Sequence, residues 1–197
     1  MMKKYDGIFR SWHWLNAMLM FALFITVLLR ETFLNKHSVA QIIAEKLNAL
    51  SIHIDNSQAI LIAKAIREPM WQWHIYLGLG IFALLIVRLF LFQTISGKIN
   101  YTHLKENTTH KFAVKVGYLV IYVAIFVVSI TGIVIAYPDT VGISKEFAHN
   151  FKELHEVASA IITIFTPLHI IGVVIAENKG EKNIVSDMIN GGRLADS

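Results

Sequence analysis

The sequence of 197 residues contains no cysteine, only three prolines and few charged side chains. The absence of cysteine excludes disulfides, iron–sulfur clusters, thiolate-ligated haem and covalently attached c-type haem. A bound metal or cofactor must therefore be held by other side chains, such as histidine or methionine. Neither a glycine-rich phosphate loop nor a dinucleotide-binding fingerprint occurs along the chain.

Charged residues make up 16% of the chain and apolar residues 55%, whereas soluble domains carry about 25% charged residues. Four stretches are long and apolar enough to span a bilayer, at about 12–29, 73–92, 113–136 and 156–176. These four segments leave no room for a large soluble domain. We therefore predict an all-α membrane protein, a four-transmembrane-helix bundle forming one domain over residues 1–197.

The first loop, about 30–70, is too long to be a bare connection. Val39, Ile43 and Leu47 follow helical spacing, and the pattern resumes after an Asp55-Asn56-Ser57 capping cluster. The loop is predicted to form two short amphipathic helices, the second closed by Pro69. Two roles remain open: a lid or partner-docking surface, or two helices lying at the lipid interface.

The distribution of lysine and arginine predicts the orientation in the membrane. Residues 28–31 (Leu-Leu-Arg-Glu) do not form a small-residue cleavage site, so 12–29 is read as a retained helix and not a signal peptide. With the N-terminus inside, the inner segments carry eleven basic residues and the outer ones seven. This bias predicts that both termini are cytoplasmic and that the charged tail lies along the cytoplasmic surface. The basic flanks account for the net charge of +4 without a nucleic-acid partner.

Nine histidines occur, and four of them fall in predicted loops or near their ends, where solvated surface side chains are expected: His37, His53, His103 and His149. His155 and His169 lie fourteen residues apart, about 21 Å along a helix and within about 40° of one face. One helix thus presents an imidazole near each side of the bilayer. His13, at the start of the first span, matches the depth of His169, and His74, at the start of the second, matches that of His155.

Histidine inside a membrane is costly and usually functional. Two pairs at matched depths predict two haems, one held by His13 and His169 and the other by His74 and His155. For any single histidine the alternative is an interfacial or hydrogen-bonded core residue. Because both axial positions of each iron would be filled, the haems would transfer electrons and not bind oxygen. The sequence does not identify the groups that accept the second ring N–H of these histidines.

Arginines and glycines near the histidines are further candidates. Arg88 lies fourteen residues after His74 and Arg10 three residues before His13, so a haem propionate is the predicted partner of Arg88 at the inner face. Snorkelling toward lipid headgroups is the alternative. Four glycines have no side chain, so either a haem or a neighbouring helix can approach the helix surface closely beside them: Gly78, Gly117, Gly132 and Gly172.

A basic cluster enters the third span from the predicted cytoplasmic side, formed by His110, Lys111 and Lys115. These residues are placed to donate hydrogen bonds to a quinone headgroup, and an ordinary basic flank is the alternative reading.

Together, these residues resemble the bacterial cytochrome b561 family, which includes the b-type cytochrome subunit of membrane nickel–iron hydrogenases. The resemblance covers all four spans and rests on four motifs: Arg10-Ser-Trp-His13-Trp14-Leu-Asn16; His74, Gly78 and Arg88; Gly117-Tyr-Leu-Val-Ile-Tyr122 with Gly132; and His155 with His169. It implies a protein of the bacterial cytoplasmic (inner) membrane, with two b haems held by the same two histidine pairs. It also implies electron exchange between the quinone pool of a respiratory chain and a periplasmic partner, such as a c-type cytochrome or another redox protein. The long first loop departs from the compact members and favours a distinct partner.

The prediction is therefore transmembrane electron transfer between a periplasmic redox partner and membrane quinone, with the status as an enzyme left open. An alternative is a stand-alone superoxide:quinone oxidoreductase, which needs a cationic outer surface. The predicted outer side carries seven basic and eight acidic residues, which argues against it. A transition-metal transporter is a third class, but such proteins use intramembrane carboxylates, and only Glu156 approaches a helix interior.

Overall fold

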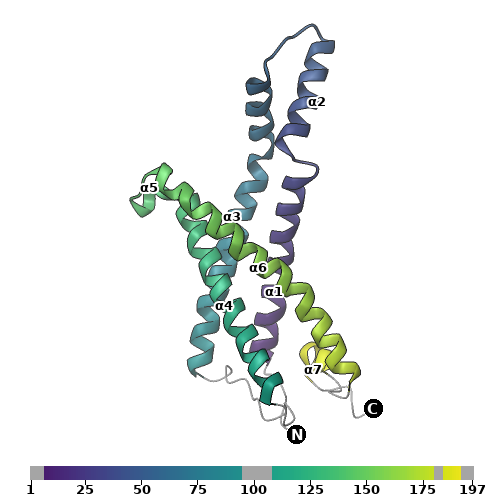
Figure 1. Cartoon of the computed structure of the whole chain (residues 1–197), viewed down its shortest axis with the longest axis vertical. Helices are drawn as coiled ribbons and strands as arrows, with labels where there is room; N and C mark the ends of the chain where they lie inside the picture. The colour runs from purple at the N-terminus through teal and green to yellow at the C-terminus, as the bar shows by residue number, and fades with distance from the viewer. Residues whose placement is uncertain (1–6, 95–107, 180–183, 192–197) are drawn as a thin grey trace. The chain divides into compact units, whose positions relative to one another are not determined.

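The computed structural model describes residues 7–94, 108–179 and 184–191, which fold mainly into helices (Figure 1). The helices are α1 (Gly7–Glu31), α2 (Lys36–Ala49), α3 (Asn56–Thr94), α4 (Thr108–Ala136), α5 (Pro138–Val141), α6 (Lys145–Asn178) and α7 (Ile184–Asn190). No strand occurs in these three ranges. The all-α prediction is confirmed.

The chain divides into two compact units, which we call the larger unit (Met1–Ala17 with Leu79–Ser197) and the smaller unit (Met18–Gly78). The division passes through α1 and α3, and each unit is described by itself.

Four helices, α1, α3, α4 and α6, are long and apolar enough to cross a membrane. Many of their large apolar side chains are exposed, among them Met18 at 68% and Phe21 at 67%. In a soluble protein such surfaces would be aggregation-prone, whereas in a bilayer they contact lipid. The prediction of four membrane-spanning helices is confirmed.

Helix α3 differs from the prediction. The second amphipathic segment and the second span form one continuous helix of 39 residues, with Pro69 inside it and not at its end. Proline removes one backbone donor, but a long helix with many other hydrogen bonds tolerates the loss. At 1.5 Å per residue, α3 is about 58 Å long against a bilayer core of about 30 Å, so part of it extends beyond the core.

The smaller unit is built around the contact of α2 with the first half of α3, which lie side by side in Figure 1. Its core is formed by the buried Ala40, Ala59 and Ala63. Small side chains at these positions let the two helices approach closely. The predicted capping cluster is confirmed, because Asp55 Oδ1 accepts from the Gln58 backbone N–H while Gln58 Oε1 accepts from the Asp55 N–H.

In the larger unit α4 and α6 pack side by side and antiparallel, joined by the short α5 (Figure 1). Gly142 ends α5 in the left-handed region, at φ 79°, and Ser144 caps the start of α6. Helix α6 therefore begins at Lys145 and not near 156 as predicted, so His155 lies three turns inside it. Helices α1 and α3 also begin before His13 and His74. The short helix α7 in the tail was not predicted.

Candidate functional site

The larger unit brings two predicted ligands together. The rings of His13 on α1 and His169 on α6 have centroids 6.3 Å apart and planes inclined by 61°. A metal–imidazole nitrogen bond is about 2.0 Å long, so two rings that bind one metal from opposite sides have centroids about 6 Å apart. The spacing and the chemistry of this donor set therefore fit a haem iron with two axial histidines.

Aromatic rings surround this pair. Trp14 meets the His13 ring edge-on at 5.6 Å, and Phe9 lies 6.5 Å from the same ring. Phe165 stacks on the His169 ring at 5.9 Å with an interplanar angle of 9°. Both histidines are half-buried. These contacts restrict the rotation of each imidazole.

His155 on α6 faces α4. Its Nδ1 lies 3.1 Å from Thr131 Oγ1, and that hydroxyl donates to the Val127 carbonyl at 2.7 Å. A Cβ at Gly132 would lie 3.1 Å from the His155 Cε1 atom, so glycine at this position leaves the space that the imidazole occupies.

His74 lies in the smaller unit and has a similar neighbour. Its Nδ1 is 2.7 Å from Thr26 Oγ1 on α1, and the Thr26 hydroxyl donates to the Leu23 carbonyl at 2.6 Å. The Trp71 ring meets the His74 ring edge-on at 5.4 Å, and the Arg30 guanidinium lies over that indole. His74 and His155 belong to different units.

The other three glycines that were singled out do not make close approaches. A Cβ at Gly117 would touch Phe165 at 3.8 Å, an ordinary contact. At Gly78 and Gly172 it would meet none of the described atoms within 4 Å. Of the four, Gly132 is therefore the position at which the described structure requires the absence of a side chain.

Arg88 is buried, with 3% of its surface exposed. Its guanidinium lies 4.8 Å from the Phe9 ring centroid and 5.4 Å from that of Trp12, and Nε donates to Tyr122 Oη at 3.0 Å. Because Phe9 contacts both Arg88 and His13, this buried cation belongs to the surroundings of the His13/His169 pair. The role of Tyr122 was not recognised from the sequence.

Arg10 contacts α7. Its Nη1 donates to the Ile189 carbonyl at 3.0 Å, and Trp14 Nε1 donates to the Met188 carbonyl at 3.1 Å. At the other end of α7, the Val185 N–H donates to the Glu177 carboxylate at 3.4 Å. The residues on both sides of His13 thus hold the C-terminal helix. The sequence signal that was overlooked is Gly191, a residue type typical of the position after a helix end.

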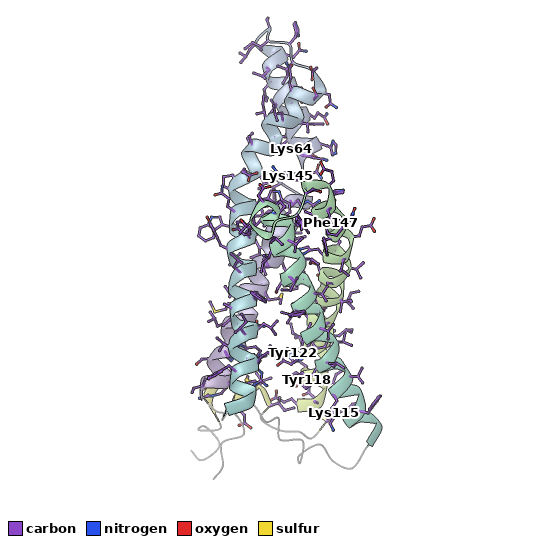
Figure 2. The ribbon with its side chains drawn as sticks, turned by 90° about the vertical axis from the view of Figure 1, so that its left-hand side faces the viewer. Lys64, Lys115, Tyr118, Tyr122, Lys145 and Phe147 are labelled. Atoms are coloured by element: carbon purple, nitrogen blue, oxygen red, sulfur yellow. The ribbon has the colours of Figure 1, made fainter. Side chains whose placement is uncertain are left out.

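Lys115 is exposed near the start of α4, and Tyr118 and Tyr122 follow it along the same helix (Figure 2). The side chains of His110 and Lys111, and the whole of His103, lie outside the described residues. His37, His53 and His149 are exposed as predicted. Among the described residues, no group of three or more histidine, cysteine, aspartate or glutamate side chains is arranged to hold a metal ion.

The family model described as prokaryotic cytochrome b561 matches residues 4–191 of the chain. No curated protein and no solved structure matched it.

Proposed function

The chain belongs to the prokaryotic cytochrome b561 family, and from that premise we propose that two b-type haems, each held by two histidines, carry electrons across the membrane through it. Membership makes the chain an electron-transport protein with b-type haem. Its four apolar helices make it a multi-pass protein of a bacterial membrane. The haem count, the ligands and the redox partners belong to the proposal.

In this proposal His13 and His169 bind one haem, and His74 and His155 bind the other. The observation that carries it is the 6.3 Å between the ring centroids of His13 and His169, because one metal between two imidazoles requires about 6 Å. The His74/His155 pair is supported by the sequence spacing and by the half-buried position of each ring.

When bound, haem supplies a one-electron couple between ferric and ferrous iron. The residues of the chain hold the haem and provide its surroundings. Four imidazoles would hold the two irons, two for each, and would leave no iron site for oxygen. Aromatic rings pack around the His13/His169 pair. The buried charge of Arg88 is proposed to balance a propionate, and Arg10 contributes further positive charge beside His13.

The redox partners follow from the same proposal. A membrane quinone exchanges electrons near Lys115, and a periplasmic c-type cytochrome or another redox protein does so on the opposite side. The bias of lysine and arginine supports a cytoplasmic position for both termini in the inner membrane. The hairpin of α2 and the first half of α3 supports a partner different from those of the compact family members.

The test is the haem content per chain of the purified protein, measured as pyridine haemochrome together with oxidised and reduced spectra. We expect two low-spin b haems. His169→Ala and His74→Ala should each retain one, whereas His149→Ala, exposed on the same helix as His169, should retain both. A single haem in the unmutated chain, or two in His169→Ala, would contradict the proposal.

A further inference from the structure

Two buried threonines contact two of the four proposed ligands in the same way. Thr26 Oγ1 lies 2.7 Å from His74 Nδ1, and Thr131 Oγ1 lies 3.1 Å from His155 Nδ1. Their exposed fractions are only 7% and 3%. Each contact joins two different helices within one unit, α1 with α3 and α4 with α6. The family resemblance did not draw attention to either threonine.

The hydroxyl protons of the two threonines have acceptors other than the histidines. A threonine hydroxyl has one proton, and here it is donated to a backbone carbonyl of its own helix, that of Leu23 or Val127. The oxygen then has lone pairs for the histidine, an arrangement that suits the tautomer protonated at Nδ1, with Nδ1–H as the donor. A neutral imidazole protonated at Nδ1 presents the lone pair of Nε2 to a metal.

We propose that Thr26 and Thr131 are positioning residues for the His74/His155 haem. Each holds its histidine in the tautomer that leaves Nε2 for the iron and fixes the ring orientation. A hydrogen bond from Nδ1–H also makes a ligating imidazole a stronger electron donor. Stronger donation favours ferric iron, so the two hydroxyls lower the reduction potential of this haem. This inference rests on the proposed function.

The other pair has different surroundings. The contacts of His13 and His169 are with the rings of Phe9, Trp14 and Phe165. His74 also meets the Trp71 ring, but hydroxyl contacts distinguish His74 and His155 from His13 and His169 and give the two haems different environments. The threonines therefore affect the reduction potential of one of the two haems.

The experiment is a redox titration of the purified full-length protein carrying Thr26→Val, Thr131→Val or both. Valine has nearly the shape of threonine but no hydroxyl. We expect the two-haem content to persist and the potential of one haem to rise while that of the other stays unchanged. The double variant should show the largest rise. Thr26→Ser and Thr131→Ser keep a hydroxyl and should restore the original potential, which a purely steric role would not predict.

Thr163→Val is the matched control. Its hydroxyl makes the same kind of bond within its helix, to the Ser159 carbonyl at 2.8 Å, but it is exposed. This variant should leave both potentials unchanged. Two haems in the valine variants with unaltered potentials would overturn the inference and leave the proposed function standing. Fewer than two haems in the unmutated chain would instead refute the proposed function.

A second measurement does not depend on the stability of the variants. Redox-difference infrared spectra of the unmutated protein, with and without ¹⁵N-labelled histidine, report the ring C–N band of a ligated imidazole. A band typical of a hydrogen-bonded Nδ1–H is expected for one haem. Bands of free Nδ1–H groups on both haems would overturn the inference.

Discussion

Arg10 Nη1 donates a hydrogen bond to the carbonyl of Ile189, a residue 179 positions later in the chain. This bond joins the first turn of α1 to the end of α7. The positive guanidinium lies where the helix leaves carbonyl groups without intrahelical partners, a favourable arrangement for a cation. Since His13 follows Arg10 by one turn, α7 is tied to the helix that carries a proposed haem ligand.

Gly191→Ala should weaken this connection. Gly191 has φ +72°, and an added Cβ would lie 3.0 Å from the Arg10 guanidinium carbon. The guanidinium must then shift by a few tenths of an ångström, which weakens its bond to Ile189. We expect a lower melting temperature and faster proteolysis after Glu177. Gly142→Ala is the control because it has a similar φ of +79° with no described atom within 4 Å of the added Cβ. Backbone strain alone costs about 1–2 kcal/mol at such positions, so equal losses in the two variants would refute a specific role for Arg10.

Gly132→Ala should disturb His155. The new Cβ would lie 3.1 Å from the ring atom Cε1, closer than most such contacts. The imidazole must shift by a few tenths of an ångström, which strains its bond to iron and its contact with Thr131. We expect the spectrum of one haem to change or its content to fall, measured as pyridine haemochrome. Gly172→Ala, where the described structure leaves open space, should behave like the unmutated protein. Identical behaviour of Gly132→Ala would contradict the described packing.

Tyr122→Phe should destabilise the larger unit by about 1.5–3 kcal/mol, the usual contribution of a hydrogen bond to a charged group. The substitution removes the oxygen that accepts from Arg88 Nε. The ring is kept, so the loss reports the hydroxyl alone. Thermal unfolding followed by circular dichroism measures the effect. Tyr76→Phe, at an exposed tyrosine, is the control, and an equal small change in both variants would show that the hydroxyl of Tyr122 contributes little.

Asp55 should titrate below its ordinary range. The Ser57 hydroxyl and the Gln58 backbone N–H stabilise its carboxylate and hold the pKa below the usual 3.8. Because the folded-state pKa is lowered, the contribution of Asp55 to stability is complete above the unfolded-state pKa. It is lost as the pH falls through the folded-state value. Nuclear magnetic resonance of labelled aspartate should record the low pKa and its return toward 3.8 in Ser57→Ala. Ser38→Ala, exposed on α2, should not change it.

The sequence by itself determined the number of spanning helices, the family and the candidate histidines. Apolar length and the positions of scarce polar residues are local properties, so they can be read without knowing which helices touch. The spacing of His155 and His169 along one helix is of this kind, as is the Asp55 cap.

Only the tertiary structure decided the rest. It showed that α3 continues through Pro69 and that α6 begins at Lys145, helix boundaries that the length of an apolar run does not mark. It identified Thr26 and Thr131 as partners of histidines 48 and 24 residues away. A threonine in an apolar helix can satisfy its hydroxyl on its own backbone, so its sequence position carries no sign of a partner. Such pairings depend on how helices face one another, which no local pattern specifies.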